Sequence, residues 1–263
     1  AMESRAIDGW LIDVEGVLHI DGRPIPGAAE ALQALAEAGV PYVLLTNTTT
    51  RTRRQLGGLL RRLGFPVSDE QIITAAAATA DYVRRHYPGE RCHLLVEGDL
   101  HEEFAGIPLT EGHDARVVVL GGAGDCFTYS RINRAFRLLL GGAAFIAMHK
   151  NLTWERQDGL YLDSGAYILG LEAATGVQAH VVGKPSADFF QAGLRLLGVP
   201  RERVAMIGDT IDQDVLPAQH LGMAGILVRT GKFRTREPEA GQPDAILDSL
   251  ADLPAWLGLR PIR

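Results

Sequence analysis

Short runs of apolar residues recur along the chain, and most of them are followed by polar residues or glycine. They lack the apolar–polar alternation of strands with one face in water, and such continuous runs are typical of strands buried on both faces of a parallel sheet. They lie at residues 10–12, 40–45, 72–74, 181–182, 204–207 and 226–228. We expect each run to form a strand of one sheet.

Segments with apolar residues at helical spacing lie between these runs, at residues 27–35, 55–63, 75–85 and 186–197, and another follows the last run near 251–257. Pro26 suits the first turn of the first helix, Gly39 suits a stop after it, and Ser186 suits the N-cap of the fourth. Strands that alternate with helices predict an α/β fold with a Rossmann-like parallel-sheet core.

The pattern changes over the middle of the chain. One clear helix, 129–140, lies among candidate strands at 92–96, 116–120, 145–148 and 160–162. Residues 157–159, Gln-Asp-Gly, are typical of a hairpin turn. Because the opening pattern resumes afterwards, we predict a core formed by 1–79 and 178–263 and an inserted α/β domain at 80–177. A looser stretch at 235–243 is expected to be a surface loop.

Composition and charge narrow the possible partners. Of the 263 residues, 46% are hydrophobic and 22% charged, which is ordinary for a globular protein with a sizeable core. The formal net charge of −6 gives no electrostatic case for a nucleic-acid partner, which normally requires a basic surface. One arginine group occurs at helical spacing, and we interpret it as a solvated helix face. Its members are Arg51, Arg53, Arg54, Arg61 and Arg62.

Cysteine usage and hydropathy indicate a compartment. Cys92 and Cys126 form no CxxC pair, which disfavours a disulfide scaffold or a structural zinc site and fits a reducing cytosol. No apolar stretch approaches 18 residues, and no basic-then-apolar leader opens the sequence. We expect a soluble, cytoplasmic protein with no membrane partner.

Polar side chains follow four of the predicted strands. Asp13 and Glu15 follow the first, Thr46 and Asn47 the second, Lys184 a third, and Asp209 and Asp214 a fourth. In a parallel sheet the carboxyl ends of all four strands would meet at one edge. A carboxylate nucleophile, hydrogen-bonding groups, a cation and acidic ligands together suit phosphoryl transfer. Oxygen ligands without nitrogen or sulfur favour Mg²⁺ as the cofactor.

The order of these motifs, DxxG, TN, GKP and GDxxxxD, resembles the haloacid dehalogenase superfamily of Mg²⁺-dependent phosphatases. The correspondence covers essentially the whole chain. The gap of 138 residues (184 − 46) between Thr46 and Lys184 would hold the large α/β cap of the NagD-type subclass, class IIA, which also includes phosphoglycolate phosphatases. The resemblance implies a cap that selects the substrate and, because such caps often dimerise, a possible homodimer.

The resemblance also implies a role for each of these side chains. Asp13 is the nucleophile, which forms an aspartyl-phosphate. Thr46 and the backbone N–H of Asn47 bind the phosphoryl group, and Lys184 neutralises it and orients Asp13. The Mg²⁺ ligands are Asp13, the backbone carbonyl of Glu15 and Asp209, with Asp214 in the outer sphere. The substrate is a small phosphorylated molecule.

Glu15 departs from the family pattern, which usually has a second aspartate there as general acid and base. The Glu15 carbonyl can still bind metal, but its carboxylate sits one methylene farther out. General acid–base catalysis contributes roughly 10²–10⁴-fold, so a misplaced carboxylate lowers the rate without abolishing turnover. Because labile P–N and phosphoanhydride bonds depend less on an acid, we hypothesise a preference for such substrates over sugar phosphates.

Other interpretations remain. A slow phosphate-binding or regulatory protein is the alternative that Glu15 raises. A dehalogenase is disfavoured by Lys184 and by the acidic residues at 209–214. Residues 121–124, Gly-Gly-Ala-Gly, lack the third glycine of a dinucleotide-binding loop and instead predict a turn that faces the active site. His149 and Lys150 are candidates for substrate contact, although we favour a structural role for His149.

Overall fold

The computed structural model describes residues 6–122, 124–232 and 241–259, so most of the predicted loop at 235–243 lies outside the described residues. The chain divides into two compact units, unit 1 (1–46, 53–73 and 189–263) and unit 2 (47–52 and 74–188). Unit 2 includes 47–52, 74–79 and 178–188, which the sequence analysis placed in the core. Within the described part of the chain, no helix is both long and apolar enough to cross a membrane.

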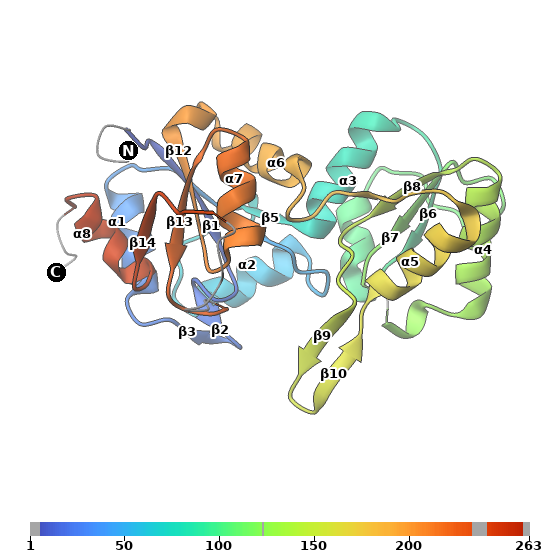
Figure 1. Ribbon diagram of the computed structural model, residues 1–263, viewed down its shortest axis with the longest axis horizontal. Helices are drawn as coiled ribbons and strands as arrows, with labels where there is room; N and C mark the ends of the chain where they lie inside the picture. The colour runs from blue at the N-terminus through green and yellow to red at the C-terminus, as the bar shows by residue number, and fades with distance from the viewer. Residues whose placement is uncertain (1–5, 123, 233–240, 260–263) are drawn as a thin grey trace. The chain divides into compact units, whose positions relative to one another are not determined.

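Unit 1 is built on a six-stranded sheet with the order β14-β13-β12-β1-β4-β5 (Figure 1). The strands are β1 Gly9–Asp13, β4 Tyr42–Thr46, β5 Ile72–Thr74, β12 Val204–Gly208, β13 Ala224–Val228 and β14 Ala245–Leu247. β1 pairs in parallel with both β12 and β4, with Ile12 opposite Ile207 and Leu44. The predicted α/β fold with a parallel-sheet core is confirmed.

Helices cover both faces of this sheet. Trp10 and Ile12, on one face of β1, belong to a core cluster with residues of α1 (Ala28–Glu37), α2 (Arg53–Arg62) and α8 (Leu253–Trp256). On the other face, Gly193 of α6 (Ala187–Leu197) lies so close to Leu11 that an added Cβ would be 3.1 Å from Leu11 Cδ2. The sheet is therefore buried on both sides, as its continuous apolar runs require.

The strand order reverses direction at β1, since β4 follows it on one side and the much later β12 pairs on the other. Open α/β sheets bind ligands beyond the carboxyl ends of their strands at such a switch point. A short hairpin, β2 (His19–Ile20) with β3 (Arg23–Pro24), follows β1 directly and was not predicted.

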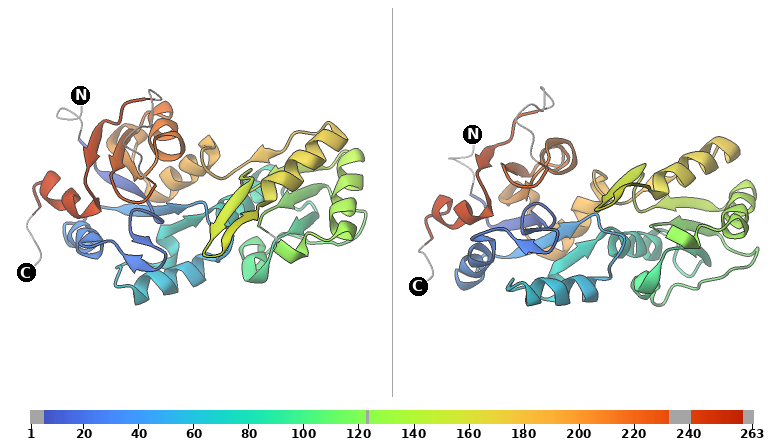
Figure 2. Two further views of the ribbon diagram at one scale, coloured as in Figure 1. Left: turned by 60° about the horizontal axis from the view of Figure 1, so that its bottom comes forward. Right: turned by 90° about the horizontal axis from the view of Figure 1, so that it is seen from below.

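Unit 2 has its own four-stranded parallel sheet, order β11-β8-β7-β6. The strands are β6 Cys92–Leu95, β7 Val117–Leu120, β8 Ala144–Ala147 and β11 His180–Val181; the helices are α3 Ala75–His86, α4 Tyr129–Leu140 and α5 Ser164–Thr175. α4 and α5 lie side by side (Figure 2) and share a core cluster with β7 and β8. The sequence pattern missed α5 because Tyr167 and the exposed Leu169, which lie outside its buried face, blur the apolar stripe.

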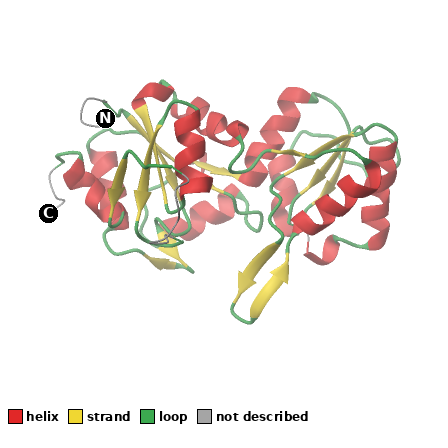
Figure 3. Ribbon diagram, in the orientation of Figure 1, coloured by secondary structure: helices red, strands yellow, loops and turns green. Residues whose placement is uncertain are grey.

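Two strands of unit 2 form the predicted hairpin. β9 (Thr153–Arg156) pairs antiparallel with β10 (Gly159–Leu162), joined at Gln157 and Asp158, and Figure 3 shows the pair extending from the rest of its unit. Leu160 and Leu162 on β10 are exposed.

Lys184 does not follow a strand of the core sheet, as the sequence had suggested. It comes after β11, which pairs with β8 in unit 2. The expectation that four strand ends converge in one sheet is therefore wrong for the strand that precedes Lys184. β11 contains only His180 and Val181, too few residues for a sequence pattern to indicate its neighbour.

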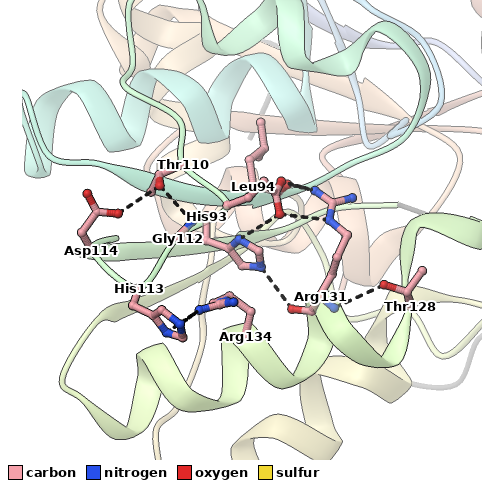
Figure 4. Close-up of polar contacts among 10 residues, drawn as sticks. His93, Leu94, Thr110, Gly112, His113, Asp114, Thr128, Arg131 and Arg134 are labelled. Carbon is pink, nitrogen blue, oxygen red and sulfur yellow. Dashed lines mark hydrogen bonds and ion pairs between the residues drawn. The ribbon is translucent and has the colours of Figure 1, made fainter.

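A polar network joins β6 to α4 (Figure 4). His93 is fully buried, and its Nε2–H donates to the Arg131 carbonyl at 3.1 Å. The Arg131 guanidinium in turn donates to the Leu94 carbonyl at 3.0 Å and to Glu111 at 2.8 Å. Because the Arg131 side chain bonds a β6 carbonyl, the network fixes α4 against the sheet.

Candidate active site

Three carboxylates meet in unit 1 at the carboxyl ends of β1 and β12. Asp13 ends β1, Asp209 directly follows β12, and Asp214 lies in a π-helical turn, Ile211–Val215. Each offers one oxygen within 4.8 Å of the other two, and their exposed fractions are 5%, 4% and 1%. The structure thus brings together three of the predicted metal-site residues.

Asp209 is held by backbone that the sequence interpretation did not single out for a role. Its Oδ2 accepts the Lys232 N–H at 2.8 Å. A Cβ on Gly16 would lie 2.1 Å from Oδ2 and one on Gly231 2.4 Å, and both glycines have positive φ. The Thr230 hydroxyl donates to the Gly16 carbonyl at 2.6 Å, which joins the two loops. Only glycine leaves room for the carboxylate at these positions.

Asp214 is fixed in a similar way. Its Oδ2 accepts the Thr210 hydroxyl at 3.1 Å and the Thr210 N–H at 3.4 Å. A Cβ on Gly208 would lie 2.4 Å from the Asp214 side chain. The GDxxxxD motif therefore works as one folded turn, in which its glycine makes space for its second aspartate.

The donor set fits a hard divalent cation. Ionised carboxylates about 4.8 Å apart repel one another by roughly 3 kcal/mol per pair at an effective dielectric constant of about 20. Burial adds a desolvation cost that only a counter-charge offsets. All the offered atoms are oxygens, the ligands that Mg²⁺ prefers.

The Glu15 carboxylate lies in a different environment. Its side chain is half exposed, and Oε1 accepts the Asp21 N–H of the β2–β3 hairpin at 3.2 Å. Oε2 lies 3.5 Å from His19 Nδ1, but that nitrogen accepts the Gly22 N–H at 3.1 Å and so carries no proton for Glu15. The described contacts of the carboxylate are thus with the hairpin.

The other predicted site residues fall into two groups. Thr46, buried at the end of β4, follows Leu45, the residue that pairs with Asp13. Asn47 and Lys184 both belong to unit 2, where the Asn47 side chain bonds the Lys184 main chain through both of its polar atoms. Lys184 is 7% exposed.

Of the weaker candidates, His149 is buried, and its Nδ1 accepts the Asn151 N–H at 3.0 Å. Burial lowers the pKa of His149, against a smaller opposing effect of Asp163. Lys150 bonds the buried Glu172 carboxylate at 2.8 Å. These contacts favour structural roles for both residues.

Known proteins resemble this chain over most of its length. Residues 10–110 match the family described as haloacid dehalogenase-like hydrolase, and residues 181–253 match a second, HAD-hydrolase-like family. The human haloacid dehalogenase-like hydrolase domain-containing protein 2 is 42% identical over 243 residues, 92% of each chain. The phospholysine phosphohistidine inorganic pyrophosphate phosphatase of Rattus norvegicus is 37% identical over 255 residues, 94% of this chain and 92% of that one.

Solved structures give the same result. The p-nitrophenyl phosphatase from Archaeoglobus fulgidus superposes with a TM-score of 0.88 at 31% identity, and NagD from E. coli K-12 with 0.86 at 30%. Each comparison covers 94% of this chain and 98% of the other. The chain therefore belongs to the haloacid dehalogenase-like hydrolase family, within which it is a phosphatase of the NagD type, class IIA.

Proposed function

We propose that this phosphatase is Mg²⁺-dependent and hydrolyses a small phosphorylated molecule through an aspartyl-phosphate on Asp13. The observation that carries the proposal is the buried cluster of Asp13, Asp209 and Asp214 beyond β1 and β12. Three buried carboxylates favour a bound cation, and one of them ends a strand at the switch point of the sheet.

Asp13, Asp209 and the backbone carbonyl of Glu15 would hold the Mg²⁺, with Asp214 in the outer sphere. When bound, the cation neutralises phosphate oxygens and lowers the repulsion between the phosphate and the carboxylate that attacks it. The Lys232 N–H and the Thr210 hydroxyl keep Asp209 and Asp214 oriented for this task.

Asp13 carries the chemistry. Its carboxylate oxygen forms a bond to phosphorus while the bond to the leaving group breaks, and the leaving group departs with the electron pair and takes up a proton. Water then attacks phosphorus and loses a proton, the bond to Asp13 breaks, and phosphate is released. Thr46, the Asn47 N–H and Lys184 bind the transferring group by resemblance to the family.

By resemblance to the family, unit 2 would act as the cap that selects the substrate. The same resemblance supports a homodimer. The exposed apolar residues Leu160 and Leu162 on β10 are suited to contact with a second copy. Cys92 and Cys126 are both free, which supports a cytoplasmic location. The proposal includes no nucleic-acid or membrane partner.

The leaving group sets the substrate class. The Glu15 carboxylate bonds the Asp21 N–H, which supports a weak general acid at this position. Substrates with P–N or phosphoanhydride bonds should therefore be turned over faster than sugar phosphates. Phosphoramidate, pyrophosphate and a sugar phosphate, compared with Mg²⁺ present, test this ranking; a sugar-phosphate preference would overturn it.

The reaction itself is tested with p-nitrophenyl phosphate. Phosphate release should require Mg²⁺, disappear with EDTA and be lost in Asp13→Asn, which keeps the size of the side chain but not its nucleophilicity. A protein that binds Mg²⁺ and phosphate with no turnover would instead support the phosphate-binding alternative. Turnover that survives Asp13→Asn would contradict the proposed nucleophile.

A further inference from the structure

The side chain of Asn47 forms two hydrogen bonds with one residue. Its Oδ1 accepts the Lys184 N–H at 2.8 Å, and its Nδ2 donates to the Lys184 carbonyl at 3.3 Å. The opposite orientation of the amide would set donor against donor and acceptor against acceptor, so the two bonds fix it. The amide thus satisfies the Lys184 main chain as a paired strand residue would.

The chain just before Lys184 is packed to permit this approach. The Val182 N–H donates to the Ala147 carbonyl at 3.0 Å and the Gly183 N–H to the Met148 carbonyl at 2.9 Å. A Cβ on Gly183 would lie 2.2 Å from the Met148 oxygen and 2.6 Å from Asn47 Oδ1. Glycine is therefore required for Asn47 and the end of β8 to contact this segment together.

The loop that carries Lys184 is closed independently at its ends. His180 Nε2–H donates to Asp188 Oδ2 at 2.6 Å, across the residues between β11 and the first turn of α6. Without Asn47, these end contacts remain, while Lys184 loses the described partners of its N–H and carbonyl. Removal of the Asn47 amide should loosen the middle of the loop without unfolding it.

We propose that the Asn47 side chain is a positioning residue for Lys184. Asn47 directly follows Thr46, a proposed phosphate ligand. The two hydrogen bonds of the Asn47 side chain therefore link the Lys184 main chain to the residue next to that ligand. This role rests on the proposed function and adds to it. The backbone N–H of Asn47 binds phosphate, while the Asn47 side chain holds Lys184 in position.

The bonds themselves are tested without any activity measurement. In Asn47→Ala, hydrogen exchange of the Lys184 amide should accelerate about tenfold or more, because its acceptor is gone. Asn47→Asp keeps an oxygen acceptor and should preserve part of the protection. Asn133→Ala is the matched control, an asparagine in α4 of the same unit, and should leave exchange at Lys184 unchanged.

The role is tested with a double-mutant cycle on kcat/KM for p-nitrophenyl phosphate with Mg²⁺. Misplacement of a catalytic group by about 1 Å costs up to roughly 100-fold, so Asn47→Ala should lose about 10- to 100-fold. In a Lys184→Ala background, the same substitution should lose less than about threefold, because the group it positions is already absent. Where turnover is too slow to measure, the same four proteins are compared by their dissociation constants for inorganic phosphate, measured by calorimetry.

Two results would overturn the inference. One is unchanged Lys184 exchange in Asn47→Ala. The other is a double variant whose loss of kcat/KM equals the product of the two single losses. Asn47 would then act independently of Lys184 or through general stability. Failure of the proposed function is distinguishable, because the wild-type protein would then show no Mg²⁺-dependent turnover while the exchange experiment still reports on the two bonds.

Discussion

The Glu15 carboxylate accepts a hydrogen bond from the Asp21 N–H at 3.2 Å, which ties it to the hairpin that follows β1. Most phosphatases of this superfamily have an aspartate at this position as general acid and base. In this chain the longer side chain bonds the hairpin backbone. This contact supports the weak catalytic role that we propose for Glu15.

Glu15→Asp should raise kcat for a sugar phosphate by at least about tenfold, since a well-placed general acid contributes roughly 10²–10⁴-fold. The shorter side chain gives up the Asp21 N–H and places its carboxyl where the family has it. Glu15→Gln is the control, because it keeps an oxygen for Asp21 but carries no acid, and it should show no gain. Equal rates in Glu15→Asp and Glu15→Gln would contradict this account.

Gly16→Ala should abolish Mg²⁺-dependent turnover, because its Cβ would lie 2.1 Å from Asp209 Oδ2. Gly22→Ala is a matched control, since Gly22 has a φ of 77° against 84° for Gly16 but no atom within 4 Å of an added Cβ. Both variants bear the strain of a left-handed conformation, about 1–2 kcal/mol. Only Gly16→Ala should also weaken Mg²⁺ binding in a calorimetric titration. A similar loss of Mg²⁺ affinity in both variants would show that crowding of the Asp209 carboxylate is not the cause.

His149 should make the fold less stable in acid. Burial lowers its pKa in the folded protein, so the unfolded chain, with an ordinary histidine pKa near 6.5, binds the proton first. The stabilising contribution is present above that pH and is lost as the pH falls toward the lower folded pKa. Protonation of Nδ1 would also break the bond from the Asn151 N–H.

The test compares urea unfolding at about pH 5.5 and 7.5. His149→Gln should lose less stability on acidification than the wild type does. His220→Gln, which removes an exposed histidine, should behave as the wild type. An identical pH dependence in all three proteins would rule out His149 as the source.

Two residues of the carboxylate cluster, Asp13 and Asp209, could be predicted because each follows a continuous apolar run. Both come at or just after strands whose buried character is visible in the sequence, and their carboxylates lie together with that of Asp214. The fold class followed from the same alternation of strands and helices.

Other features depend on contacts that no local pattern encodes. Asp209 accepts the N–H of Lys232, 23 residues later, and Glu15 bonds a hairpin only two residues long on each side. β14 (Ala245–Leu247) was missed, and β11 was assigned to the wrong sheet. Short strands take their neighbours from tertiary packing rather than from their own residues.

The aspartyl-phosphate on Asp13 is the central claim, and chemical trapping tests it most directly. Enzyme quenched in acid during turnover of p-nitrophenyl phosphate is reduced with borohydride and digested, and the peptide that contains residue 13 is sequenced by mass spectrometry. The account predicts homoserine at position 13, formed from the acyl phosphate, in the wild type with Mg²⁺ and its absence in Asp13→Asn. Turnover with unmodified Asp13, or modification at another carboxylate instead, would contradict it.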